Sequence, residues 1–290
     1  MSVLLPVYNA GSYLDEALRS IRRQTLEDWE LVVVNDGSTD ESQLVIDRHA
    51  REEPRIRPLQ QPNGGLVSAL NRGLVSCRGG LIARMDADDV ALPDRFERQV
   101  RVMEERPEWV AVGGAAVLID EDGQPVGQSQ NPVGPEAVHA KLMSGGYALL
   151  HPTMMIRGEV LERIGGYDAQ YQSSEDLDLL LRLDAEGPMG NLAEPVLKYR
   201  QSGGSMSKRL HSRYPYFDWR ALSAARRRGR PVTRWSLAAS ADRVSWSAVR
   251  RGDRREAFRF AWRAWLTRPW GYVGYRSLLR CIFGRELEGR

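Results

Sequence analysis

Cysteine is scarce in this 290-residue chain. Its two cysteines, Cys77 and Cys281, match no disulfide or metal-ligand spacing, which indicates a reducing, cytoplasmic setting. No run of about 18 or more apolar residues occurs, so we expect no segment to span a bilayer. The first strand is predicted to begin at Ser2 with no charged segment before it, so we expect no signal peptide.

A glycine-rich phosphate-binding fingerprint is also missing. The first predicted strand, residues 2–8, is followed by Asn9-Ala10-Gly11-Ser12 rather than by Gly-x-Gly-x-x-Gly. In dinucleotide-binding folds those glycines bring the backbone close to the pyrophosphate. The sequence therefore argues against a dinucleotide oxidoreductase, and a nucleotidyltransferase is also a weaker hypothesis.

Acidic and basic residues are unevenly distributed, although the net charge is only +3. Residues 206–290 contain 20 arginines and Lys208 against six acidic residues, a formal charge of +15, which leaves −12 for residues 1–205. The same segment holds six of the eight tryptophans. We therefore expect two parts, a domain over 1–205 and a basic, Trp- and Arg-rich helical segment over 206–290.

Short apolar runs alternate with helical patterns along residues 1–205. Buried strands are expected at 2–8 and 31–34, and further strands at 56–59, 81–85 and 110–118. The alternation is typical of βαβ units and predicts an α/β fold with a mostly parallel sheet. Ser38 and Glu41 are spaced as a capping pair for a helix through about residue 51.

An acidic cluster follows the apolar run at residues 81–83. It reads Arg84-Met85-Asp86-Ala87-Asp88-Asp89. A strand that ends in carboxylates places oxygen ligands at the carboxyl edge of a sheet, where ligands bind in open α/β folds. Such oxygens suit Mg²⁺ or Mn²⁺ shared with substrate phosphates. The alternative is a solvated acidic loop that caps the next helix through Asp94.

Further polar motifs follow in order along the chain. They are Pro6-Val7-Tyr8-Asn9, Asn35-Asp36-Gly37-Ser38-Thr39-Asp40, Asn63-Gly64-Gly65-Leu66, Leu70-Asn71-Arg72-Gly73, Leu92-Pro93-Asp94-Arg95, His151-Pro152-Thr153, Gly166-Tyr167-Asp168, Ser174-Glu175-Asp176-Leu177-Asp178-Leu179 and Tyr199-Arg200. Together with the acidic cluster, this series over residues 2–207 resembles the family 2 glycosyltransferases. Those are inverting enzymes with the GT-A fold, a Rossmann-like domain that binds nucleotide-sugars. The version Ala83-Arg-Met-Asp-Ala-Asp-Asp89 resembles the subgroup that builds bacterial surface polysaccharides.

The resemblance implies a donor site at the sheet edge. Pro6, Tyr8 and Asp36 match residues that hold the nucleotide base, with Asp36 as the acceptor for a base N–H, and Asp86 matches a residue near the ribose. A tyrosine taken alone is more often a packed aromatic than a base contact, whereas the motif favours the contact for Tyr8.

It also implies the metal ligand and the base. Asp88 matches the ligand of Mn²⁺ or Mg²⁺, and Asp176 matches the general base that takes the proton of the acceptor hydroxyl. An acidic first helical turn is also favoured by the helix dipole alone, which accounts for Glu175 and Asp178 without a catalytic role.

Several positions keep two interpretations. His151 is either a structural loop histidine or an acceptor-side residue, and Asp168 is expected to form a turn. Arg84 and Arg95 either pair with the acidic cluster or reach phosphate. Ser202 stands where relatives commonly carry a histidine after Tyr-Arg.

For residues 206–290 three interpretations compete. Amphipathic helices with arginine on one face and Trp or Phe on the other lie in membrane interfaces. A helical subdomain that packs on the catalytic domain or on a second subunit is the plainer alternative. Nucleic-acid binding is the weakest of the three, because the acidic first part would repel phosphates.

We therefore expect a metal-dependent, inverting glycosyltransferase. It would move a sugar from a nucleotide-sugar, of the UDP class, to a glycan or lipid-linked acceptor in surface polysaccharide synthesis. It would work in the cytoplasm, peripherally at the inner face of the cell membrane. The alternative from another class is a catalytically silent GT-A-like scaffold or partner subunit at the membrane surface.

Overall fold

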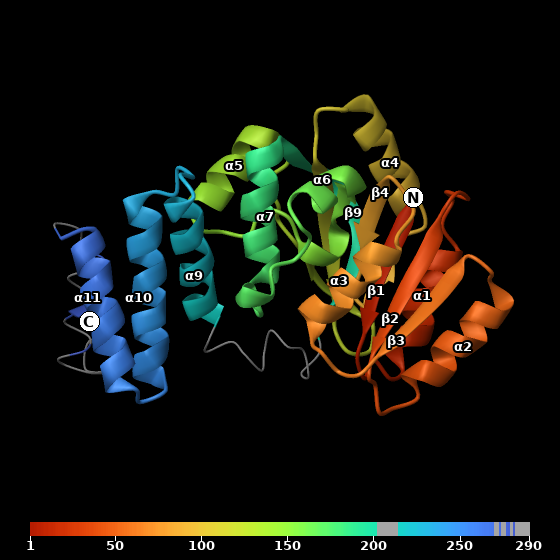
Figure 1. Ribbon diagram of the computed structural model, residues 1–290, viewed down its shortest axis with the longest axis horizontal. Coiled ribbons are helices and arrows are strands. Elements are labelled where there is room, and N and C mark those ends of the chain that lie inside the picture. Colours follow the sequence, from red (N-terminus) through yellow and green to blue (C-terminus); the bar gives the residue numbers. More distant parts are fainter. Residues whose placement is uncertain (202–213, 270–272, 274–276, 279–280, 282–290) are drawn as a thin grey trace. The chain divides into compact units, whose positions relative to one another are not determined.

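The computed structural model describes residues 1–201, 214–269, 273, 277, 278 and 281. The chain packs as two compact units (Figure 1). The first unit comprises Met1–His139, Ala148–Gln170 and Arg182–Gly203, and the second comprises Ala140–Tyr147, Tyr171–Leu181 and Gly204–Arg290. The predicted division between residues 205 and 206 stays a prediction.

The first unit is built on one sheet whose strand order is β3-β2-β1-β4-β8-β6-β9-β5, with β7 paired to β6. Its first four strands all run parallel. They are β1 (Ser2–Val7), β2 (Glu30–Asp36), β3 (Ile56–Gln61) and β4 (Leu81–Arg84). Every residue of β1 is buried, because helices cover both faces of the sheet.

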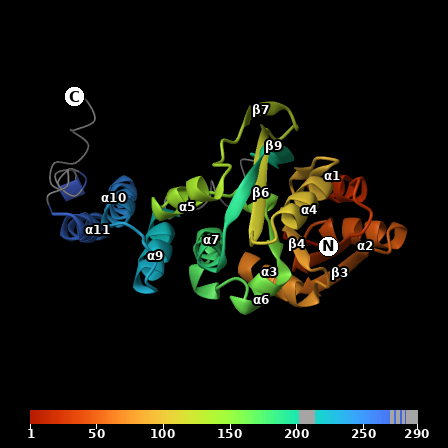
Figure 2. The ribbon, with the colours of Figure 1, turned by 90° about the horizontal axis from the view of Figure 1, so that it is seen from above.

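Antiparallel pairs enter beyond β4. The remaining strands are β5 (Val90–Ala91), β6 (Ala111–Ile119), β7 (Pro125–Gln128), β8 (Met155–Arg157) and β9 (Met189–Arg200). β8 runs antiparallel to β4 and β6. β6 and β9 are parallel neighbours, which lie side by side in Figure 2. The α/β fold and the parallel core predicted from the sequence are confirmed.

Helices lie on both faces of this sheet. They are α1 (Tyr13–Arg22), α2 (Ser42–Glu52), α3 (Leu66–Ser76), α4 (Arg95–Glu105) and α6 (Gly158–Arg163). α1 and α4 share one apolar core with the Val3 and Leu5 side of β1. α3 packs on the opposite side, where Gly73 approaches Leu4 so closely that a Cβ would lie 2.2 Å from its Cδ1.

The second unit is helical. It contains α9 (Tyr214–Arg227), α10 (Arg234–Arg250) and α11 (Arg254–Thr267), while α5 (Pro135–Met143) and α7 (Glu175–Glu186) each belong partly to both units. Side-chain caps at Thr233 and Asp253 start α10 and α11. Ser202 and most of residues 270–290 lie outside the described residues. Among the helices described, none is long and apolar enough to cross a membrane.

Candidate active site

Three adjacent parallel strands of the first unit end in the polar motifs. β1 pairs with β2 on one side and with β4 on the other (Figure 1). Tyr8, Asp36 and Asp86 therefore lie at the ends of neighbouring strands, at the same edge of the sheet. This is the edge at which open α/β sheets bind ligands.

Pro6 and Tyr8 differ in what they expose. Pro6 is buried inside β1, whereas Tyr8, just beyond the strand, is 54% exposed. The alternative of a packed core aromatic is therefore wrong for Tyr8. Its exposed ring leaves a surface on which a planar base can stack.

The loops that follow β1 and β2 are tied together. Asn9 accepts a hydrogen bond at Oδ1 from the Thr39 amide at 2.8 Å, and its own amide donates to Ser38 Oγ at 3.0 Å. The Gly11 amide donates to the Asp40 carboxylate at 2.9 Å. Asn9 has φ 49°, a left-handed conformation that asparagine tolerates better than most residues. These bonds fix the loop that carries Tyr8.

Asp36 is the last residue of β2 and is only 3% exposed. Its Oδ1 accepts from Gln61 Nε2 at 2.7 Å and from the Gly64 amide at 2.8 Å, and its Oδ2 accepts from the Gly65 amide at 2.8 Å. The buried carboxylate therefore anchors the turn between β3 and α3. The motif predicts only a base contact for Asp36 and gives no sign of this anchoring role.

Arg84 and Asp86 form a two-pronged ion pair. The guanidinium nitrogens Nη1 and Nη2 each lie 2.6 Å from one carboxylate oxygen of Asp86. Arg95, which is fully buried, donates instead to the backbone oxygen of Arg84 at 2.8 Å and to Gln99 at 3.0 Å. Of the two arginines, Arg84 pairs with the acidic cluster and Arg95 supports its backbone.

Asp88 is half-buried and Asp89 is buried. Burial, with a contribution from the Asp86 charge, raises the pKa of Asp88 to about 6. Asp89 is fully buried, and burial raises its pKa well above the usual range. Asp94 begins the next helix without a side-chain cap. The alternative of a solvated, helix-capping loop is therefore wrong.

Arg200, at the end of β9, holds this acidic turn in place. Its amide donates to Asp89 Oδ1 and its Nε donates to the backbone oxygen of Asp88, both at 2.9 Å. Nη1 donates to the backbone oxygens of residues 120–121, and Nη2 donates to Glu16 at 2.7 Å. One guanidinium thus connects the acidic turn to the turn that follows β6 and to α1. The sequence motif contained Arg200, but its pattern gave no sign of this role.

Three motifs converge in a chain of hydrogen bonds. Asn71 on α3 accepts from the Tyr167 amide at 2.9 Å and donates to the Tyr167 backbone oxygen at 2.8 Å. The Tyr167 hydroxyl lies 2.8 Å from Nε2 of His151. His151 is 7% exposed, and burial, aided by the Arg84 charge, keeps its pKa well below the usual value. The structure therefore favours the structural interpretation of His151. Asp168 forms a turn, as expected, by accepting from the Gln170 amide at 2.9 Å.

Asp176 lies in the second unit, in the first turn of α7. It is half-buried, and its Oδ1 accepts from the Leu177 amide at 2.8 Å. The hydroxyl of Tyr147 donates to Asp218 at 2.6 Å in the same unit. Burial, then the charges of Asp176, Asp218 and Glu175, raise the pKa of Tyr147, so that this hydroxyl stays protonated. Asp176 therefore lies among acidic side chains, close enough to the Tyr147 hydroxyl for its charge to act on it.

The sequence can be compared with known families. Residues 2–165 match the model of the family described as "Glycosyl transferase family 2". The chain belongs to this family. The glycosyltransferase is 34% identical over 214 residues to the amylovoran biosynthesis glycosyltransferase AmsE of Erwinia amylovora. The aligned region covers 72% of this chain and 79% of AmsE. It is 32% identical over 212 residues to the O-antigen biosynthesis glycosyltransferase WbnJ of Escherichia coli. That aligned region covers 72% of this chain and 82% of WbnJ.

Solved structures share the GT-A fold of this glycosyltransferase. The mannosyltransferase PcManGT of Pyrobaculum calidifontis, in complex with GDP-Man and Mn²⁺, aligns with a TM-score of 0.61 at 18% identity, covering 98% of this chain and 87% of that one. S. aureus TarS 1-349 in complex with UDP-GlcNAc aligns with a TM-score of 0.60 at 17% identity, covering 97% and 78%. The family and the fold predicted from the motifs are confirmed.

Within the acidic cluster of this glycosyltransferase, Asp88 is the carboxylate that suits a divalent cation. Asp86 directs both oxygens at Arg84, and Asp89 is buried against the Arg200 amide. In the described part of the chain, no side chain donates a hydrogen bond to the Asp88 carboxylate. Among the same residues, no group of three or more His, Cys, Asp or Glu is placed to hold a metal. Mg²⁺ and similar hard cations are often bound through one or two carboxylates, completed by water and substrate phosphates. Asp88 fits such a shared ion.

Proposed function

We propose that this glycosyltransferase is metal-dependent and inverting, and that it uses a nucleotide-sugar of the UDP class. The observation that carries the proposal is the donor edge: Tyr8, Asp36 and Asp88 follow three adjacent parallel strands, and Asp88 keeps its carboxylate for a ligand. TarS bound to UDP-GlcNAc and PcManGT bound to GDP-Man and Mn²⁺ support a nucleotide-sugar donor and a divalent ion.

At this edge each residue would have a separate task. The exposed ring of Tyr8 would stack on the base, beside the buried Pro6. Asp36 would hold the turn at residues 63–65 and use a remaining lone pair to accept a base N–H. Asp86, oriented by Arg84, would accept from the ribose hydroxyls.

Asp176 would be the general base. Its carboxylate would take the proton of the acceptor hydroxyl, while the acceptor oxygen forms its bond to the anomeric carbon and the bond to the diphosphate breaks. Attack opposite the leaving group inverts that carbon, and one base suffices because the diphosphate leaves as a stabilised anion. Mn²⁺ or Mg²⁺ held at Asp88 would supply positive charge for that diphosphate.

The acceptor would be a growing glycan or a lipid-linked sugar in surface polysaccharide synthesis. AmsE and WbnJ, named for amylovoran and O-antigen biosynthesis, support this assignment. We place the enzyme in the cytoplasm, peripherally at the inner face of the cell membrane. The basic segment 206–290 would meet the anionic lipid there.

A donor-binding screen tests the first half of the proposal. UDP, GDP, dTDP and CMP are each added with and without Mn²⁺, and the melting temperature is followed. We expect UDP to stabilise the wild type only with metal, and Asp88→Asn to lose that shift. Asp94→Asn, a nearby carboxylate with its side chain 51% exposed, is the matched control and should keep it. A wild type that no nucleotide stabilises would favour the silent scaffold instead.

Asp176→Asn tests the second half. The variant should keep the melting shift with UDP and Mn²⁺ but lose sugar transfer by about a hundredfold or more, since it lacks the proton acceptor. Transfer is followed as UDP release with isolated surface glycan or lipid-linked sugar as acceptor. Transfer at the wild-type rate would remove Asp176 from the mechanism.

A further inference from the structure

Helix α11 turns a narrow face inward. Ala257, Phe260, Ala261 and Ala264 are buried at helical spacing, and three of these four are alanines. Phe260 packs against Trp219 of α9 with ring centroids 5.1 Å apart. This inward face accounts for the contribution of α11 to the core of the second unit.

The opposite face of α11 is also apolar. Phe258, Trp262 and Leu266 are 51%, 44% and 57% exposed. They are four residues apart, so they form one stripe along the helix. Trp265 joins this stripe, with its ring centroid 4.9 Å from that of Trp262. Three large aromatic side chains and a leucine on one outward stripe mark an interaction surface.

Arginines border the stripe. Arg255 and Arg259 are exposed one turn apart on the same outward side of α11. They belong to a segment whose formal charge is +15 over residues 206–290. The partner of this surface must therefore combine apolar material with negative charge.

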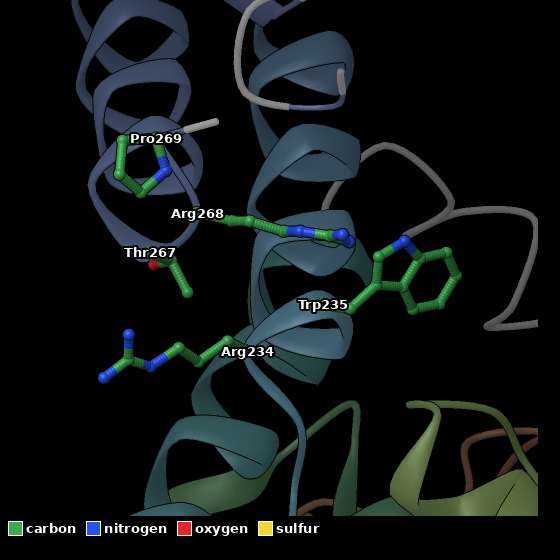
Figure 3. A pocket seen from close by; sticks show the side chains of 5 residues that line it. All are labelled: Arg234, Trp235, Thr267, Arg268 and Pro269. Carbon is green, nitrogen blue, oxygen red and sulfur yellow. The ribbon is translucent and has the colours of Figure 1, made fainter. Parts of the chain in front are cut away.

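A hollow lies where α11 ends beside the start of α10. Its volume is about 690 Å³, and its lining is Arg234, Trp235, Thr267, Arg268 and Pro269. Figure 3 shows the side chain of Arg268 extending toward the indole of Trp235, with Arg234 below Thr267. Trp235 is 49% exposed. The Arg268 guanidinium, which extends toward an open aromatic ring, suits a phosphate that sits near apolar chains, and Arg234 adds a second positive charge to the lining.

We infer that this face of α11, together with the Arg234 and Arg268 hollow, docks on an anionic phospholipid bilayer. The stripe would enter the interface, and the arginines would meet lipid phosphates. A second copy of the chain is disfavoured because two such basic faces repel each other. A nucleic acid leaves the apolar stripe without a partner. The inference deepens the proposed function, and rests on it for the membrane-bound acceptor that docking would serve.

Co-sedimentation of the full-length protein with vesicles tests the inference. The vesicles contain phosphatidylcholine alone, or phosphatidylcholine with about one-third phosphatidylglycerol. We expect binding to the anionic vesicles only. Phe258→Ser/Trp262→Ser/Leu266→Ser should reduce the partition coefficient at least about tenfold, and Arg234→Gln/Arg268→Gln should reduce it about tenfold.

Leu44→Ser/Val75→Ser is the matched control. These apolar side chains are 72% and 90% exposed in the first unit, so the double variant should bind as the wild type does. Light scattering on each variant reports the oligomeric mass. Equal binding by the triple variant and the wild type, or equal binding to both vesicle types, would overturn the inference. The inference would also be overturned if the wild type did not bind vesicles and formed a dimer that the triple variant did not form.

The UDP melting shift is measured on the same samples without vesicles. A kept shift with absent vesicle binding would overturn docking and leave the proposed function standing. Intact vesicle binding without a UDP melting shift would overturn the proposed function and leave membrane docking standing.

Discussion

Arg200 donates a hydrogen bond from Nε to the backbone oxygen of Asp88 across 2.9 Å. The guanidinium is almost completely buried, with its side chain 2% exposed, and its remaining N–H groups reach Glu16 and residues 120–121. The candidate metal ligand is thus positioned through its own backbone by an arginine from another strand. Partners of this kind orient a ligand without touching the ion.

Arg200→Lys should therefore lower both the affinity for the metal and the stability of the folded protein. Lysine keeps the charge but replaces a planar fork of donors by one ammonium, which cannot reach acceptors on three sides. We expect the free energy of unfolding to fall by about 2–4 kcal/mol. The Kd for Mn²⁺ in the presence of UDP should rise at least about tenfold. Urea denaturation and Mn²⁺ titration measure the two effects.

Arg163→Lys is the control for this substitution. Arg163 makes one bond to Glu186 at 2.7 Å from a side chain that is 56% exposed. An exposed pair of this kind contributes less than about 1 kcal/mol. Unchanged Mn²⁺ affinity in Arg200→Lys would mean that Asp88 does not depend on this clamp.

Asp88→Asn should stabilise the metal-free protein at neutral pH. The pKa of Asp88 is about 6 in the fold and about 3.9 in an unfolded chain. Between these values the folded protein holds a proton that the unfolded chain has lost, so stability falls as the pH rises from about 4 to 6. Asparagine removes this cost, which we expect to be about 1–2 kcal/mol at pH 7 after allowance for solvent screening.

Urea unfolding in the presence of a chelator at pH 7 and pH 4 measures the effect. The gain should be present at pH 7 and nearly absent at pH 4, where the folded carboxyl is protonated and the unfolded one is about half protonated. Asp94→Asn should show no such difference. Equal stability of Asp88→Asn and the wild type at both pH values would show that the charged Asp88 carboxylate does not lower the stability of the fold.

Asp36→Asn should loosen the turn between β3 and α3. Asp36 accepts from Gln61 and from the amides of Gly64 and Gly65, all three of which are donors. An asparagine must present its NH₂ group to at least one of them. We expect a loss of about 1–3 kcal/mol of unfolding free energy and weaker UDP binding. Asp47→Asn, at an exposed position on α2 with one contact to Gln43, is the control. Wild-type stability would show that the turn does not need the carboxylate.

Elements defined by local pattern could be predicted. The apolar runs at residues 2–8 and 31–34 became the buried strands β1 and β2. The Ser38 cap was wrong, because α2 begins only at Ser42 and Ser38 Oγ instead accepts from the Asn9 amide. A hydroxyl used by a loop 29 residues away leaves no local sign.

The candidate site divides in the same way. Carboxylates after a buried strand predict a ligand edge, because the strand end alone determines where they emerge. The partners of those residues could not be predicted. Arg200 and Asp89 are 111 residues apart, and Asn71 and Tyr167 are 96 residues apart. Only the order of strands in the sheet and the packing of α3 bring them together.

His151 should make the fold sensitive to acid. Burial, with the nearby Arg84 charge, keeps its pKa well below the unfolded value of about 6.5. Below pH 6.5 the unfolded chain takes up a proton that folded His151 refuses, so stability decreases by about 1.4 kcal/mol per pH unit from this residue. His151→Gln should remove this slope between pH 6.5 and 5 while keeping a hydrogen-bond partner for the Tyr167 hydroxyl.

Urea unfolding of the wild type and the variant across this range measures the slope as a difference, which cancels the titration of other groups. Tyr167→Phe is the companion variant, because it removes the hydroxyl that lies 2.8 Å from Nε2 and leaves the histidine in place. It should lose stability at every pH and keep the wild-type slope. If His151→Gln kept the slope as well, the acid sensitivity would come from another group, and His151 would not be the buried neutral histidine that its surroundings require.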